Sequence, residues 1–145
     1  MNFDPAIAAQ AAFQQVLASG VLGSDADAAV EAEATFSVSA GADAKAAYAT
    51  LQELGQSHPN AQAFQEFLIY ITWQQVTEET IPLHFRRGLD LCTQYLARFC
   101  RAVEPDDMGP RQVRALRESF RGGLGLVEED DHGAEYDKDA FAGGD

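Results

Sequence analysis

Residues 83–103 carry the clearest amphipathic pattern in the sequence, and this pattern favours an α-helix. At the helical period the large apolar side chains fall within an arc of about 100°, the width of a face that packs against a core. Gly88 lies on that arc, where the missing side chain would let a neighbouring backbone approach closely. The chain must bury this face, so a helical bundle is the expected solution. The apolar arc comprises Phe85, Leu89, Cys92, Leu96, Phe99, Cys100 and Val103.

Four other segments have clear helical signals, bounded by capping residues, glycines and prolines, and the alanine-rich segment 25–35 is interpreted as a short helix. Asp4 and Pro5 form a typical cap and first turn, Gly20 is a typical stop, and Asn60 is expected to cap the fourth helix. Residues 35–41 are interpreted as a loose connection, so the expected fold class is all-α, a single bundle of four to five helices. The expected helical ranges are about 5–19, 25–35, 43–55, 61–81 and 109–121.

The segment 61–81 is apolar on two sides, which is typical of a helix with neighbours on both faces. Such a helix in a short chain is also compatible with a homodimer. Its aromatic residues Trp73 and Tyr70 are candidate contacts for a partner. One side carries Phe64, Phe67, Leu68 and Ile71, and the other carries Ile69, Trp73 and Val76.

The domain organisation follows from where the apolar residues stop. A chain of 145 residues is enough for one domain with a real core. Residues 1–123 are predicted to form that helical domain, with the strongest core in 43–121. Residues 124–145 have few large apolar side chains and many acids, so they are predicted to be a disordered acidic tail.

The net charge of −13 sets limits on the partners. An acidic chain repels nucleic acids and anionic membranes, so neither is an expected partner. The acidity fits a genome that favours alanine and arginine over lysine, or alternatively a halophilic surface. Cys92 and Cys100 lie about 12 Å apart on one helix and cannot form a disulfide with each other. Together with a start that lacks a basic signal region, this favours a cytoplasmic location.

The charge is distributed unevenly along the chain. Residues 1–80 carry ten acids and one base, residues 81–121 carry eight bases and five acids, and residues 122–145 carry eight acids and one lysine. Part of the basic excess forms a predicted partner-binding arginine face, in which Glu118 is expected to pair with Arg114 and Arg121. The acidic tail is a candidate to cover this face. The face comprises Arg111, Arg114, Arg117 and Arg121, joined by Arg86 and Arg87.

No catalytic or cofactor-binding spacing occurs in the sequence. Phosphate-binding glycine loops, nucleophile elbows and paired metal-ligand motifs are all missing, so no enzyme activity and no cofactor are expected. The weak candidates for a metal or haem site are His84, Cys92 and Cys100, although free cysteines on an apolar arc are usually core residues.

The function class favoured by these observations is a non-enzymatic protein–protein interaction module. Such a module acts as an adaptor, a chaperone-like accessory subunit or an immunity-type inhibitor, and its partner has a basic surface or an acidic motif. The first alternative is a bundle that binds a metal, haem or small apolar ligand near His84. The second is an arginine-face binder of nucleic acid or phosphate, gated by the acidic tail.

Overall fold

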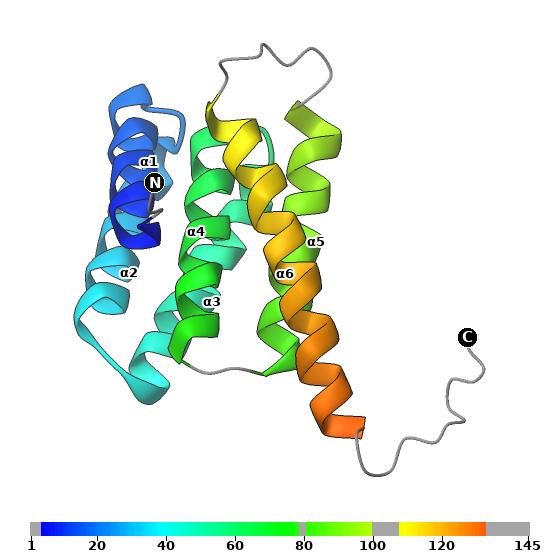
Figure 1. Cartoon of the computed structure of the whole chain (residues 1–145). Coiled ribbons are helices and arrows are strands. Elements are labelled where there is room, and N and C mark those ends of the chain that lie inside the picture. Colours follow the sequence, from blue (N-terminus) through cyan, green and yellow to red (C-terminus); the bar gives the residue numbers. More distant parts are fainter. Residues whose placement is uncertain (1–3, 79–80, 100–107, 133–145) are drawn as a thin grey trace.

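The computed structural model describes residues 4–78, 81–99 and 108–132, and within these every regular element of secondary structure is a helix. Successive helices run in alternating directions (Figure 1). The all-α prediction is confirmed, while the six helices exceed the expected four to five. They are α1 (Pro5–Ser19), α2 (Ala26–Val38), α3 (Gly41–Ser57), α4 (Gln62–Glu78), α5 (Pro82–Phe99) and α6 (Met108–His132), with a short 3₁₀ helix at Gly23–Asp25.

The first helix begins and ends where the sequence predicts. One carboxylate oxygen of Asp4 accepts hydrogen bonds from the backbone N–H groups of Ala6 and Ile7, at 2.9 and 3.3 Å. Pro5 occupies the first turn, where its missing N–H leaves no bond unmade. Gly20 ends the helix with a φ of +73°, a left-handed conformation that glycine adopts without strain.

The second helix is longer than predicted. It continues to Val38 through residues that were interpreted as a loose connection, and α3 begins at Gly41 after two residues. The short alanine side chains of α2 give little amphipathic contrast, so the sequence pattern does not show where this helix ends. Ala29 and Ala32 are nevertheless buried, and α2 packs on α3.

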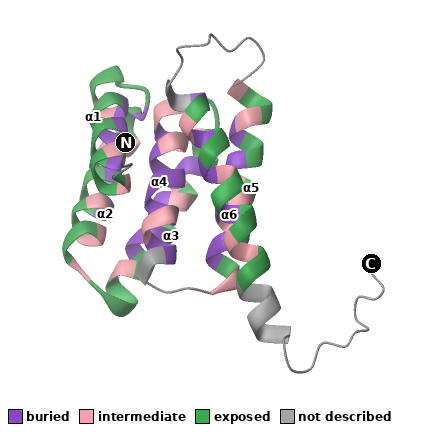
Figure 2. Ribbon diagram, in the orientation of Figure 1, coloured by how far each residue is buried: buried purple, intermediate pink, exposed green. Residues whose placement is uncertain are grey.

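The fourth helix is the centre of the bundle, as its two apolar faces predict. It packs on α1, α3, α5 and α6 (Figures 1 and 2). On one side Phe67 contacts Phe13 of α1, with ring centroids 4.8 Å apart. On another side Trp73 meets Phe120 of α6 edge to face, at 5.0 Å. The core therefore extends to α1, outside the 43–121 range. In the described parts of the chain, no helix is both long enough and apolar enough to cross a membrane.

The sixth helix extends beyond the predicted end of the domain. It passes through Gly122 and Gly123 without a break and reaches His132, so the expected boundary at 123/124 lies inside a helix. The glycine at 123 is required by packing, because a Cβ there would lie 2.2 Å from the Phe85 ring of α5. Leu124 then packs against the core. The rest of the predicted tail, residues 133–145, lies outside the described residues.

Candidate functional site

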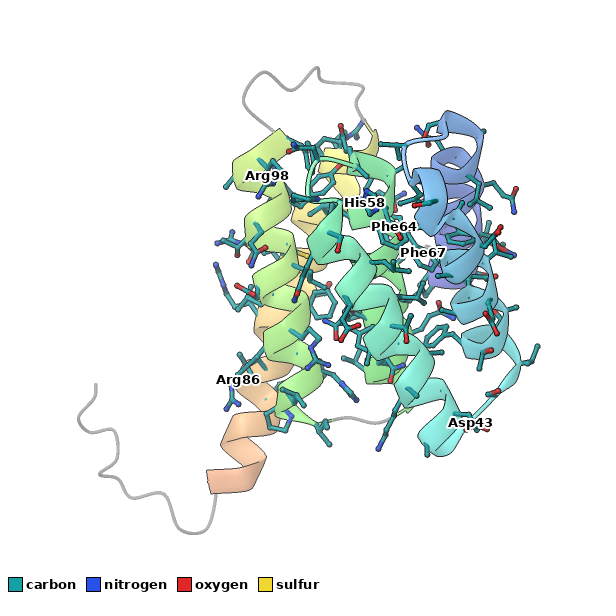
Figure 3. The ribbon with its side chains drawn as sticks, turned by 180° about the vertical axis from the view of Figure 1, so that it is seen from behind. Asp43, His58, Phe64, Phe67, Arg86 and Arg98 are labelled. Atoms are coloured by element: carbon teal, nitrogen blue, oxygen red, sulfur yellow. The ribbon has the colours of Figure 1, made fainter. Side chains whose placement is uncertain are left out.

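A groove opens between α3 and α5 because these two helices pack on α4 but make almost no direct contact with each other. The groove has a volume of about 690 Å³. Figure 3 shows this side of the molecule, with α3 and α5 side by side. We call it the α3–α5 groove. Its walls are Gln52 and Gln56 of α3 and Leu83, Arg86, Arg87, Asp90, Leu91, Gln94 and Arg98 of α5, and its floor includes Gln65 and Leu68 of α4.

The end of α3 is fixed against α4, which sets the position of one wall. A Cβ on Gly55 would lie 2.3 Å from Leu68, so the last turn of α3 rests directly on α4. The Gln65 amide of α4 donates hydrogen bonds to the carbonyl oxygens of Gly55 and His58, at 3.0 and 3.1 Å. Each carbonyl also accepts a backbone hydrogen bond, Gly55 from His58 N–H at 3.2 Å and His58 from Ala61 N–H at 3.1 Å, so the Gln65 amide adds a second donor to both. His58 in turn contacts Asp25, 2.7 Å away.

Arginine side chains of α5 lie at both ends of the groove. Arg87 lies 5.6 Å from the centre of the Tyr48 ring of α3, a cation–π contact that reaches across to the opposite wall. Arg98 donates a 3.2 Å hydrogen bond to Asn60 in the turn between α3 and α4. Asn60 is thus a partner of Arg98, and α4 begins at Gln62. Figure 3 shows Arg86 and Arg98 at opposite ends of α5, separated by about 18 Å along the helix axis.

The groove combines positive charge with apolar surface. Three arginines line it against one acid, Asp90, whose carboxylate accepts a 3.0 Å hydrogen bond from Gln94. Leu83 is 50% exposed at one end. Phe99 is half-buried at the other end and packs on Tyr95, with ring centroids 4.9 Å apart. This lining suits a ligand that carries carboxylates and one or two apolar side chains.

The predicted arginine face is divided between two surfaces. Arg86 and Arg87 line the α3–α5 groove, whereas the four arginines of α6 do not. Arg117 donates a 3.3 Å hydrogen bond to Thr93 of α5. Glu118 contacts Arg121 at 3.6 Å as expected, but its second partner is Arg117 at 3.9 Å rather than Arg114. The sequence places all six arginines on amphipathic helices. Only the packing of α5 between α4 and α6 shows that the two α5 arginines and the four α6 arginines face different directions.

The two candidate aromatic contacts are used inside the bundle. Tyr70 is 4% exposed, and burial raises its pKa, with further contributions from Glu66 and Cys92. Trp73 is half-buried against Phe120. Neither residue lines the α3–α5 groove.

The metal-site candidates are not brought into a ligand cluster. His84 and Cys92 are both buried on α5, and Cys100 lies outside the described residues. Burial raises the pKa of the Cys92 thiol to about 12, partly opposed by Arg117. A thiol of this kind is a poor nucleophile and a poor metal ligand at neutral pH. Among the described residues, no group of three histidines, cysteines or acids could hold a metal ion.

The buried phenols and the Cys92 thiol predict that the protein loses stability in alkali. Burial is the largest cause of the raised pKa values of Tyr48, Tyr70, Cys92 and Tyr95. In the unfolded chain these groups ionise at about pH 9 to 10. Above that pH the unfolded state therefore loses protons that the folded state still holds. The stabilisation that these protonated groups give the folded state is complete below that pH range and decreases as the pH rises through it.

Urea unfolding at constant ionic strength, followed between neutral pH and pH 11, should therefore show a midpoint that falls progressively above pH 9. The chain has only two lysines, so lysine deprotonation contributes little to this change. A Cys92→Ala variant should lose less of its stability at the start of the decline. A midpoint that stays constant to pH 11 would contradict the burial of these groups.

A second concavity, of about 680 Å³, lies between α1, α2, α3 and α4. Its floor includes Phe67 and Ile71, and its charged lining residues are Glu33 and Lys45. Neither His84 nor Cys92 lines it. The predicted small-ligand site near His84 therefore does not coincide with this concavity.

Comparisons with protein-family models, curated proteins and solved structures find no match to this chain. The geometry and charge of the groove are therefore the observations that bear on function.

Several groove residues could not be found from the sequence. Gln52, Gln56 and Leu91 have no unusual pattern, and they become notable only because α3 and α5 stand apart on α4. The one available signal is Leu83, a large apolar residue in the first turn after Pro82 and off the main apolar arc of its helix.

Proposed function

We propose that this protein is a non-enzymatic protein–protein interaction module and that its α3–α5 groove binds an acidic segment of a partner protein. The observation that carries the proposal is a groove with three arginines in a chain whose net charge is −13. Most of the molecule repels an acidic ligand, and the groove attracts it. This separation of charge orients an acidic partner and makes its binding specific, because approach of the partner to an acidic part of the surface costs electrostatic energy.

The lining also indicates how the segment is held. Arginine guanidinium groups form paired, charge-assisted hydrogen bonds with carboxylates. The apolar surface of Leu83, Leu91 and Phe99 offers room for an anchoring side chain between these charges. Short acidic motifs with one or two apolar anchors are recognised in this way. An adaptor or an accessory subunit would use such a groove to hold its partner.

Neutralising the groove should weaken binding of an acidic peptide by about 3- to 150-fold, since each of the three exposed ion pairs contributes about 0.2–1 kcal/mol. The variant is Arg86→Gln/Arg87→Gln/Arg98→Gln in the full-length chain. The probe is a short fluorescein-labelled peptide of Glu and Asp with one Leu and one Phe, hereafter the acidic probe. Its affinity is measured by fluorescence anisotropy. A peptide with Gln and Asn in place of the acids should not bind.

The matched control is Arg111→Gln/Arg114→Gln/Arg121→Gln, which removes the same charge from exposed positions of α6. It should keep the affinity of the wild-type protein within about twofold. If the control loses binding and the groove variant keeps it, the α6 arginines are the binding surface and the groove proposal is wrong. An oligonucleotide that binds the groove more tightly than the acidic probe would instead support a phosphate-binding function.

A further inference from the structure

We propose that the second concavity, between α1, α2, α3 and α4, binds a small zwitterion, an α-amino acid with an apolar side chain. It lies at the end of the bundle where α2 turns into α3 (Figure 1). Its volume of about 680 Å³ falls within the range of about 300–1,000 Å³ that is typical of small-molecule sites. The concavity shares no lining residue with the α3–α5 groove, so the two sites are independent.

The second concavity exists because α1 and α2 pack on different helices. The first helix packs mainly on α4 and the second mainly on α3, which leaves a space over α4 between them. The short side chains of Ala9 on α1 and Ala44 on α3 help to keep that space open. Its floor is one stripe of α4, formed by Phe67, Ile71 and Gln75 at intervals of four residues.

Gln75 gives this floor a polar group without a partner. Its side chain is only 8% exposed, yet its amide makes no hydrogen bond in the part of the chain that the structure describes. Because Gln75 lines the concavity, its amide is accessible from there. A buried amide without a hydrogen-bond partner is unfavourable. A ligand that offers a donor or an acceptor at this place would satisfy it.

The first turn of α3 favours the carboxylate group of a ligand. Gly41, the first residue of α3, lines the concavity with its backbone alone. The preceding residue, Ala40, makes no side-chain hydrogen bond to the N–H groups of this turn. Free N–H groups and the helix dipole attract an anion. Lys45, one turn further along α3, lines the same concavity, and its three N–H donors allow it to bind a carboxylate in addition to its contacts within the protein.

Glu33 of α2 suits the ammonium group of the same ligand. One of its carboxylate oxygens accepts a 2.9 Å hydrogen bond from Ser37, and a carboxylate has lone pairs for further donors. Among the described residues Glu33 forms no ion pair, and it is not paired with Lys45 although both line the concavity. Two opposite charges that line one concavity without pairing are complementary to a ligand that carries both charges.

The apolar part of the ligand has a surface to contact. Phe36 of α2 is half-buried at the concavity and packs on Tyr48, with ring centroids 6.2 Å apart. It lies over a floor that includes Phe67 and Ile71. An aliphatic side chain placed here removes apolar surface from water. The concavity should therefore prefer a leucine-like amino acid over glycine.

The first experiment titrates L-leucine into the ¹⁵N-labelled full-length protein and follows the backbone amide shifts. The shifts should lie at Gly41, Lys45 and Gln75. N-acetyl-L-leucine lacks the ammonium group and L-leucinamide lacks the carboxylate, so each loses one of the two charge contacts. Each should bind at least about threefold more weakly than L-leucine, and glycine should also bind more weakly.

Two glutamate variants then test the ammonium contact. Glu33→Gln should weaken the binding of L-leucine by at least about threefold. The matched control is Glu31→Gln, which removes the same charge from the same helix at a residue that does not line the concavity. It should change the affinity by less than about twofold.

A third variant, Gln75→Met, keeps the side-chain volume and removes the amide. It should weaken the binding of L-leucine by about 2- to 10-fold. The midpoint of urea unfolding should stay the same or rise, because the amide has no hydrogen bond to lose in the described part of the chain. A lower midpoint with unchanged binding would show that Gln75 has a structural role and would contradict the inference.

Three other results would overturn the amino-acid site. They are equal binding of L-leucine and its two blocked derivatives, an equal effect of Glu33→Gln and Glu31→Gln, and no amide shift with L-leucine up to its solubility limit. None of them bears on the α3–α5 groove, because binding of the acidic probe is measured separately and at different residues.

Discussion

Substitution of Phe67 by alanine is expected to lower the free energy of unfolding by about 3–5 kcal/mol. Phe67 is 1% exposed, and its ring lies between Phe13 of α1 and Phe64 of its own helix, with centroids at 4.8 and 5.6 Å. The helices that face it are rich in alanine, so few neighbouring side chains are long enough to fill the cavity. The cost should therefore lie in the upper part of the range, measured by urea unfolding followed by circular dichroism.

The matched control for this change is Ile7→Ala on α1. Ile7 is 68% exposed, and its truncation should change stability by less than about 0.5 kcal/mol. A loss below about 1 kcal/mol for Phe67→Ala would mean that α1 does not pack on α4 as described.

The second large effect is expected at Gly88, where the Phe120 ring of α6 packs directly against the backbone of α5. A Cβ at this position would lie 2.1 Å from the Phe120 ring. That ring is fully buried and packs edge to face on Trp73, so it cannot turn away freely. Gly88→Ala should therefore destabilise the protein by about 1–3 kcal/mol, although alanine is the better helix former.

The same substitution at Gly122 should have the opposite sign. Gly122 lies inside α6 and is exposed, and a Cβ there meets nothing within 4 Å. Gly122→Ala should stabilise the protein by up to about 1 kcal/mol through helix propensity alone. Stabilisation of both variants in the same urea experiment would contradict the close packing of Phe120 of α6 against Gly88 of α5.

These two glycines show how far local sequence could predict the fold. Gly88 lies on an apolar arc, so its role in a close helix crossing could be predicted. The predicted helix 109–121 ends just before the glycine pair at 122–123, because glycine commonly ends helices. What continues α6 is the contact between Gly123 and Phe85, residues far apart in sequence. The local sequence is compatible with a helix that ends at these glycines and with one that continues through them, and tertiary packing determines which one forms.

The groove illustrates the same limit for the candidate site. The basic character of 81–121 is evident from counting charges, and this segment includes the arginines of α5 that line the groove. Which arginines act together depends on which helices flank α5. Because α4 and α6 cover other sides of α5, Arg86 and Arg87 face α3 instead of joining the α6 arginines. The periodicity of a single helix does not show which other helices pack beside it.

Stability and the proposed binding should be separable in this protein. The rings that fill the core, such as Phe67 and Phe120, are fully buried. The groove arginines are exposed or half-buried on the outer side of α5. Charge-neutralising changes in the groove should therefore alter binding with little change in folding.

The most direct test of the central claim is an NMR titration of the ¹⁵N-labelled full-length protein with the acidic probe. The account predicts progressive amide shifts along both walls of the α3–α5 groove, at Gln52, Gln56, Leu91 and Gln94, with few shifts on α1. Shifts that follow the exposed arginines of α6, or no shifts at saturating probe, would contradict it.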